Sequence, residues 1–344
     1  MRNNFIVLLL IVVFSACSTT NRLTLSVIEP APVSISPAIK RVGIINRSEA
    51  NEKNNLLNKI EKIVTLESKT LDTDGAKSCV LGLQDELLSN SRFEEVILLD
   101  HIILKGSGIG IMPAALPQDE VTKICRANEL DAIFALESYD TNSKINYNTA
   151  PAPINTPLGT IPAMEHIATL RTEITTGWRI YDPLASDVID AFQLVDVINS
   201  TGRGLTPVNA ANAIIGRKEA VKDVSKRIGQ TYGLRIRPFS IRVGRDYFVR
   251  GTDNFKIAKR KARTGNWDEA AELWKKETQN SRKKIAGRAY YNMAIINEIN
   301  GNLDLAVDWA QKSYENFNNK KALYYVNILK NRQYRNAVLN EQQQ

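Results

Sequence analysis

Histidine and cysteine are scarce in this sequence, which holds two histidines and three cysteines in 344 residues. The two histidines, His101 and His166, lie on different predicted elements, and no cluster of cysteine, histidine and aspartate has the spacing of metal ligands. We therefore expect no metal site and no histidine-dependent nucleophile. The sequence predicts a protein that is not an enzyme, with no catalytic residues and no cofactor.

Long hydrophobic runs are also missing. The longest, from Phe5 to Phe14, holds ten residues, whereas a helix that crosses a bilayer needs about 20. The run follows a positive charge at Arg2 and precedes the small residues Ser15 and Ala16, a pattern typical of a cleaved signal peptide. We therefore expect residues 1–17 to be a signal peptide rather than a transmembrane helix.

The end of this segment, Phe14-Ser15-Ala16-Cys17, resembles the lipobox of bacterial lipoproteins, with Phe14 where leucine is more usual. The resemblance implies that the Cys17 thiol receives a diacylglyceryl group and that cleavage before Cys17 frees an N-terminus for acylation with a fatty acid such as palmitate. Each buried CH₂ group of such chains contributes about 0.8 kcal/mol, so several chains hold a protein on a membrane. Membrane lipid is thus the expected partner of Cys17. The alternative is an ordinary cleaved signal with an incidental cysteine.

The residues after Cys17 bear on the location of the protein. No aspartate follows Cys17, which in lipoproteins of bacteria with two membranes implies the outer membrane, here with the chain facing the periplasm. The chain is similar to envelope lipoproteins of the Bacteroidetes type, although the acidic residues that usually follow the cysteine in surface-exposed members are missing. Residues 18–37 contain Pro30, Pro32 and Pro37 and are predicted to be a linker that holds the folded part off the bilayer.

Residues 38–250 show the alternation of strands and helices that predicts an α/β domain, of α+β character, with a mixed sheet. Proline excludes a central strand, so the stretch from Tyr139 to Pro162 is predicted to be a surface loop. The predicted strands are 40–46, 93–100, 131–137, 170–180, 188–197 and 239–249, of which 170–180 and 188–197 form an antiparallel hairpin at the sheet edge. Three helices are predicted. The first begins at Asp74-Gly75, the second is a short helix that includes Val121 to Cys125, and the third runs from Ala210 to Tyr232.

Cys79 and Cys125 both lie on the apolar stripes of predicted helices. An oxidising compartment allows a disulfide between them. Two buried free thiols are equally consistent with the pattern.

Parts of this domain resemble the core of curli-secretion lipoproteins and penicillin-binding-protein activator lipoproteins. The resemblance rests on the strand 40–46, on Arg92-Phe93-Glu94, on the strand ending at Asp100, and on Glu129-Leu130-Asp131-Ala132-Ile133. It implies a periplasmic α/β domain. The sequence shows no pair of long alternating hairpins, and this departure puts the pore-forming role of the curli family in doubt.

A repeat follows in residues 251–335. Gly265-Asn266-Trp267-Asp268-Glu269-Ala270 and Gly301-Asn302-Leu303-Asp304-Leu305-Ala306 are 36 residues apart. The spacing is close to the roughly 34 residues of a tetratricopeptide repeat, and the glycine closes one helix while the small alanine permits close helix crossing. The segment resembles that family, with Gly265, Trp267, Ala270, Gly301 and Ala306 as the signature, and this implies a helical array. It departs from the family at Asn297 and in lacking a proline after Ser313. Residues 336–344 are predicted to be a disordered tail.

The positive charge of the chain is concentrated in the same region. Residues 251–344 hold 17 Lys and Arg against 10 Asp and Glu, whereas residues 18–250 hold 27 of each sign. No aromatic and basic module of the nucleic-acid-binding kind accompanies it, so nucleic acid is not an expected partner. A solvated surface is one interpretation, and a docking surface for an acidic peptide or for lipid headgroups is the other. The predicted partner-binding residues are Lys256, Lys259, Arg260, Lys261, Arg263, Lys275 and Lys276.

Three functional hypotheses follow. The first is a non-catalytic, membrane-anchored lipoprotein that serves as a scaffold for an envelope protein. The second is an oligomeric export component of the curli type, which requires a homo-oligomer. The third, an enzyme acting on envelope glycans, requires a carboxylate pair in a cleft, and the sequence gives it the least support.

Overall fold

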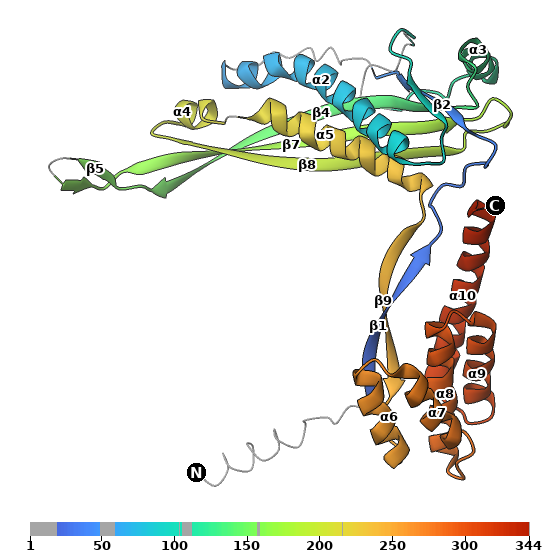
Figure 1. Cartoon of the computed structure of the whole chain (residues 1–344). Helices are drawn as coiled ribbons and strands as arrows, with labels where there is room; N and C mark the ends of the chain where they lie inside the picture. The colour runs from blue at the N-terminus through green and yellow to red at the C-terminus, as the bar shows by residue number, and fades with distance from the viewer. Residues whose placement is uncertain are drawn as a thin grey trace. The chain divides into compact units, whose positions relative to one another are not determined.

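The computed structural model describes residues 19–48, 59–102, 104, 112–156, 159–214 and 216–343 (Figure 1). Within these ranges the chain forms two compact units. We call the unit Ala31–Arg237 the α/β unit. The C-terminal unit combines the described residues up to Pro30 with Pro238–Gln344. The predicted boundaries, 38 and 250, therefore differ from the structural ones at both ends.

A mixed sheet organises the α/β unit, as predicted. Among the described residues its strand order is β3-β2-β4-β7-β8. Strand β2 is parallel to β3 and β4, whereas β7 is antiparallel to both β4 and β8. The strands are β2 (Arg41–Asn46), β3 (Glu95–Leu98), β4 (Ala132–Pro151), β7 (Met164–Tyr181) and β8 (Asp190–Gly204).

Helices cover both faces of this sheet. Successive strand residues point to opposite faces. Ile44 packs in the cluster that contains residues of α2 and α5, whereas Ile45 packs in the cluster that contains residues of α3. Figure 1 shows α2 and α5 side by side. The helices are α2 (Lys59–Ser89), α3 (Gln118–Asn128), α4 (Pro207–Asn212) and α5 (Arg217–Gly233), followed by the 3₁₀ turn η1 (Leu234–Ile236).

Two predicted helix boundaries are wrong. Helix α2 runs through Asp74-Gly75, where we predicted its start. Gly75 inside the helix makes room for Tyr139, whose hydroxyl group would clash with a Cβ there. The helix predicted from Ala210 to Tyr232 is split into α4 and α5. Gly216 precedes α5 with a φ of 72°, which interrupts the helical path.

The predicted surface loop from Tyr139 to Pro162 is also wrong. Strand β4 continues to Pro151 and pairs with β7 as far as Met164, and the short pair β5 (Ile154–Thr156) and β6 (Gly159–Ile161) follows. No strand pairs with the far side of this part of β4 among the described residues, so Pro151 lies on a sheet edge, where proline is tolerated. A long hairpin of β4 and β7 is therefore present where the sequence predicted a loop.

Cys79 and Cys125 are free thiols. They are buried in different core clusters, Cys79 with α2 and Cys125 with α3. Burial raises the pKa of the Cys125 thiol to about 11. A thiol in this state is a poor nucleophile.

An antiparallel ribbon of two strands begins the C-terminal unit. Strand β1 (Thr20–Glu29) pairs with β9 (Phe239–Phe248) from Thr20↔Phe248 to Glu29↔Phe239. Leu23 and Val27 of β1 are buried. The predicted linker is therefore a strand over these residues, and β9 pairs with β1 instead of closing the α/β domain as predicted.

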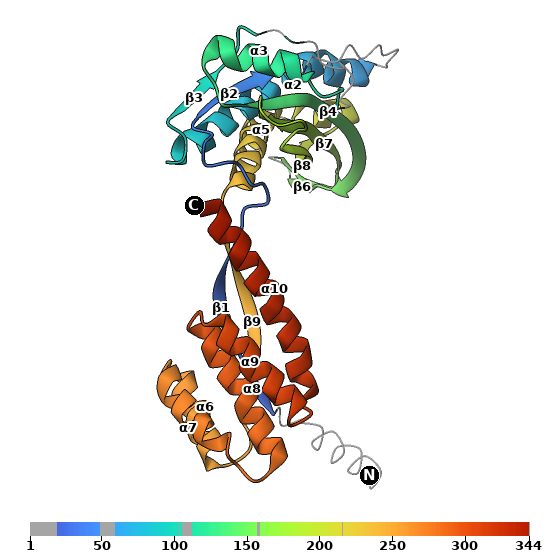
Figure 2. The same cartoon turned by 90° about the vertical axis from the view of Figure 1, so that its right-hand side faces the viewer.

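The rest of the C-terminal unit is a run of helices, each in contact with the next (Figure 2). They share one core cluster with the ribbon, in which Ala270, Ala306 and Trp274 are fully buried. The last helix continues to Gln343, so the predicted disordered tail is helical over residues 336–343. The helices are α6 (Asp253–Arg263), α7 (Trp267–Glu277), α8 (Lys283–Ile299), α9 (Leu303–Glu315) and α10 (Lys320–Gln343).

The two turns of the predicted repeat have the same geometry. Gly265 and Gly301 adopt left-handed φ angles of 84° and 79°, which glycine reaches without strain. In each turn the next residue's N–H donates back to a helix carbonyl, from Asn266 to Lys261 at 2.9 Å and from Asn302 to Asn297 at 2.8 Å. The two turns thus share a backbone geometry as well as a sequence pattern.

No helix within the described ranges combines the length and the apolarity needed to cross a membrane.

Candidate functional site: an arginine-lined groove

The predicted basic residues divide into two groups. Lys256, Lys259, Arg260 and Arg263 follow the spacing i, i+3, i+4, i+7 along α6 and therefore share one face of that helix. Lys261 lies elsewhere on α6 and forms an ion pair with Glu269 of α7. Lys275 and Lys276 are exposed in the last turn of α7.

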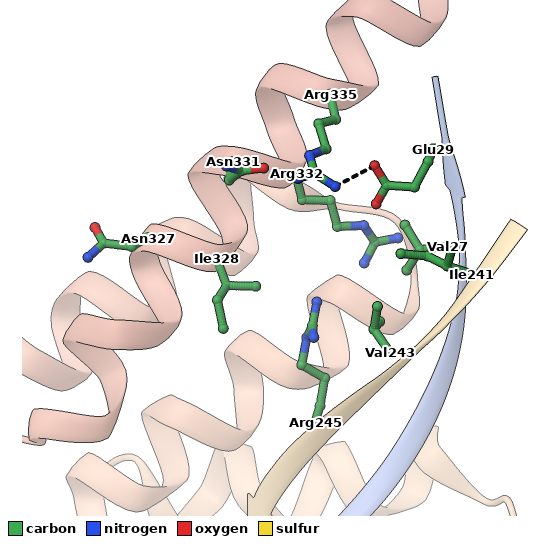
Figure 3. A pocket seen from close by; sticks show the side chains of 10 residues that line it. All are labelled: Val27, Glu29, Ile241, Val243, Arg245, Asn327, Ile328, Asn331, Arg332 and Arg335. Carbon is green, nitrogen blue, oxygen red and sulfur yellow. Dashed lines mark hydrogen bonds and ion pairs between the residues drawn. The ribbon is translucent and has the colours of Figure 1, made fainter. Parts of the chain in front are cut away.

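The structure shows a second basic feature that the sequence did not predict, a groove between α10 and the β1–β9 ribbon (Figure 3). Its cavity volume is about 370 Å³, which lies within the range of about 300–1,000 Å³ that small-molecule pockets occupy. Its residues are Val27, Glu29, Ile241, Val243, Arg245, Asn327, Ile328, Asn331, Arg332 and Arg335. The floor is thus aliphatic and the walls carry three arginines.

A buried carboxylate, Glu298 of α8, holds two of these arginines in place. Arg245 donates from Nε and Nη2 to the two oxygens of Glu298, each at 2.8 Å. Arg332 donates from Nη1 at 2.7 Å, and the Tyr325 hydroxyl donates at 2.5 Å. The Glu298 side chain is fully buried, so these bonds fix the arginines at the base of the groove.

The charge state of this cluster follows from its hydrogen bonds. Burial alone would raise the pKa of Glu298, but hydrogen bonds from Arg245 and Tyr325 outweigh burial, and the pKa lies below its ordinary value. Burial and the neighbouring Glu298 raise the pKa of the Tyr325 hydroxyl well above its ordinary value. Glu298 is therefore ionised and Tyr325 is neutral at neutral pH. Two guanidinium groups on one carboxylate leave a surplus positive charge.

The upper wall has donors to spare. Arg335 forms an ion pair with Glu29 at 2.6 Å, shown as a dashed line in Figure 3. A guanidinium carries five N–H donors. The hydrogen bonds of Arg332 and Arg335 to these two glutamates each use one nitrogen. Figure 3 shows both side chains reaching from α10 toward the strands, while Arg245 rises from β9 into the same space.

This arrangement suits recognition of a carboxylate that is attached to an apolar group. Arginine binds carboxylates through paired N–H donors, and the floor of Val27, Ile241, Val243 and Ile328 offers aliphatic contact beside them. Glu29 and Glu298 balance only part of the charge of the three arginines. An acidic ligand is therefore favoured over a basic one.

The α/β unit contains a related cluster that the sequence analysis also missed. Glu137 of β4 is fully buried and pairs with Arg47, which directly follows β2, while the Tyr181 hydroxyl donates to it at 2.6 Å. Arg179 lies 3.5 Å from the same carboxylate. Arg47 could have been noticed because it stands immediately after an apolar strand, where a charged side chain is either solvated or paired.

No group of three or more His, Cys, Asp or Glu that could hold a metal ion occurs within the described residues. Cys17, the predicted lipidation site, lies outside the described residues.

Comparison with known proteins gives a family without an assigned activity. A family model described as a domain of unknown function (DUF8603) matches residues 39–248, more than half of the chain. The chain belongs to this family. A second model, also described as a domain of unknown function (DUF6340), matches residues 256–331 and so covers most of helices α6–α10. The sequence matches no curated protein.

Among solved structures, the chain is similar to a neuraminyllactose-binding hemagglutinin homolog from Helicobacter pylori. The two share 14% sequence identity, and the match covers 57% of this chain and 90% of that chain, with a TM-score of 0.27. A TM-score this low carries no argument about fold or function.

Proposed function

We propose that this protein is a non-catalytic lipoprotein of the cell envelope that binds a partner protein through its C-terminal unit. The anchor is the acylated Cys17, which the signal-like residues 5–16 precede. The location is the outer membrane, with the folded units in the periplasm, because no aspartate follows Cys17.

The helices α6–α10 act in this proposal as a short array of the tetratricopeptide type. Support comes from the 36-residue spacing of Gly265 and Gly301, from their matching left-handed turns, and from the buried Ala270 and Ala306 at equivalent positions. About three such repeats are normally needed to bury a continuous core. Here the β1–β9 ribbon shares the helical core, with Leu23, Tyr247 and Phe248 packed into it.

The groove beside α10 is the partner site, and its occupant is an acidic segment of the partner with apolar side chains. One observation carries this proposal. Arg332 and Arg335 each use one nitrogen on Glu298 or Glu29, which leaves further N–H donors beside an aliphatic floor. A carboxylate bound there would gain paired hydrogen bonds, and its apolar neighbour would leave water.

A defined peptide tests the groove. We would titrate the protein with an acetylated and amidated peptide of alternating glutamate and valine, and follow binding by calorimetry. We expect the acidic peptide to bind and a lysine–valine peptide of the same length not to bind. Arg335→Glu should weaken binding about tenfold or more, because it replaces an attraction with a repulsion.

Matched variants on the same helix serve as controls. Lys330→Glu makes a charge reversal at an exposed position outside the groove and should leave affinity within about twofold of wild type, since screened surface charges contribute little. Asn331→Trp should block the groove, whereas Asn336→Trp, also exposed and outside it, should not. Equal binding of both peptides, or equal effects of the paired variants, would overturn the proposal.

A further inference from the structure

The ribbon register fixes where the chain enters the C-terminal unit. Thr20 pairs with Phe248, and the N–H of Val249 donates to the Thr19 carbonyl at 3.0 Å. Cys17 precedes Thr19 by two residues, and an extended chain spans at most about 3.6 Å per residue. Two residues of chain reach at most about 7 Å, so the proposed anchor is tied closely to this end of the ribbon.

Helix α6 lies at this same end of the ribbon. It begins at Asp253, four residues after Val249. Its Phe255 packs in the core cluster that also contains Phe248 and Val249. Figures 1 and 2 both show α6 beside the end of the ribbon at which β1 begins. A membrane attached to Cys17 would thus meet α6 before most of the unit.

The outward face of α6 is basic. Three apolar residues of the helix are buried against the unit, namely Phe255, Ala258 and Ala262. A basic stripe lies elsewhere on the helix and consists of Lys256, Lys259, Arg260 and Arg263. Lys256 pairs with the exposed Asp253. Lys259, Arg260 and Arg263 make no ion pair within the described part of the chain.

We propose that this stripe lies against the bilayer and binds the anionic headgroups of the phospholipids that surround the anchor. The position rests on the proposed acylation of Cys17. The chemistry follows from the four cations on one helix face, each of which strengthens attachment to an anionic surface when it lies close to it. A single acyl chain anchors weakly, and a basic surface beside the acyl chains adds a second, electrostatic attachment.

The test uses the chain without residues 1–17, so that acylation does not enter the measurement. We would measure its co-sedimentation with vesicles of phosphatidylcholine alone and with vesicles that contain an equal amount of phosphatidylglycerol. We expect binding only to the anionic vesicles and loss of binding in high salt. The variant with Lys256→Gln, Lys259→Gln, Arg260→Gln and Arg263→Gln should lose on the order of 100-fold in partition coefficient, at about fivefold for each of the three cations that form no ion pair within the described ranges.

Two controls separate the stripe from net charge. The first removes four exposed charges from the α/β unit, with Lys77→Gln, Lys123→Gln, Lys144→Gln and Arg227→Gln. The second is Lys261→Gln on α6 itself, because Lys261 is paired with Glu269. We expect both to stay within about twofold of wild type, apart from the general effect of net charge. Circular dichroism would check that each variant is folded.

The outcomes are distinct. Equal loss of binding in the stripe variant and in the α/β control would overturn the inference, and so would equal binding to both kinds of vesicle. Failure of the peptide titration would overturn the groove as a partner site and leave the vesicle result standing. Failure of acylation at Cys17 would remove the anchor, and with it the position of the stripe on a membrane.

Discussion

Glu137 in the α/β unit and Glu298 in the C-terminal unit have similar chemical surroundings. Each is a fully buried carboxylate that accepts a tyrosine hydroxyl and lies beside two arginines. The arginines of Glu298 line an open groove, whereas Arg47 beside Glu137 is buried and its Nε has no partner. The arginines of the Glu298 cluster therefore present charge to the groove, whereas Arg47 of the Glu137 cluster is enclosed in the core.

A buried charge alone does not identify the candidate site, because both clusters contain a fully buried carboxylate. A buried ion pair is a weak argument for stability, since its desolvation cost offsets its attraction. Removing one member is costly in either setting, because the remaining charges stay buried without compensation. The two clusters should thus respond alike to loss of the carboxylate and differ in ligand binding.

The largest expected effect is the loss of either carboxylate. Glu298→Gln and Glu137→Gln should each lower the free energy of unfolding by about 3–5 kcal/mol, because two guanidinium groups lose their counter-charge. Chemical denaturation would measure both. A loss below about 1 kcal/mol at either site would show that water reaches that cluster.

A smaller effect is expected at the tyrosines. Tyr325→Phe removes one hydrogen bond to an ionised carboxylate, which contributes about 1.5–3 kcal/mol. Tyr181→Phe should cost more, since the Tyr181 hydroxyl also accepts the Leu116 N–H at 3.1 Å, and this donor would lose its partner. Chemical denaturation of the two single variants measures both losses. A larger loss for Tyr325→Phe than for Tyr181→Phe would contradict this prediction.

The free energy of unfolding should depend on pH through Glu298. Its pKa is lowered in the folded state from an ordinary value of 4.5, so the unfolded chain binds the proton more readily. The stabilisation is therefore present above about pH 4.5 and is lost as the pH falls through the folded-state pKa. Unfolding measured from neutral pH to about pH 3 should show a steeper loss for wild type than for Glu298→Gln, and parallel curves would contradict the lowered pKa.

The smallest effect on the free energy of unfolding is expected at an exposed ion pair. This pair serves as the contrast to the two buried clusters. Arg203 and Glu165 form an ion pair in which the Arg203 side chain is 67% exposed. Arg203→Gln should change the free energy of unfolding by less than about 1 kcal/mol. The same denaturation assay applies, and a loss as large as that of Glu298→Gln would remove the distinction.

The parts of the fold that the sequence predicted are those with local patterns. The apolar run 40–46 corresponds to β2, the alternation over 170–180 to part of β7, and the helical pattern at Val121 to Cys125 to α3. The turns at Gly265 and Gly301 were also predicted, because a glycine that recurs at this repeat spacing is typical of the end of a helix.

The parts that the sequence could not predict depend on contacts between distant residues. β1 forms because it pairs with β9, more than 200 positions away, as in the hydrogen bond from Asn21 to Tyr247, while three nearby prolines favoured a linker. The groove combines β1, β9 and α10, so no local pattern marks it. The basic run on α6 was visible, but its division into an outward stripe and the paired Lys261 needed the packing of α7.

The proposed attachment of the protein to a membrane depends on Cys17. Radiolabelled palmitate should enter the wild-type protein and fail to enter Cys17→Ala, and the mature wild-type chain should begin at the acylated Cys17 by mass spectrometry. A mature chain that begins elsewhere, or that stays in solution without detergent and carries no label, would contradict the proposed anchor.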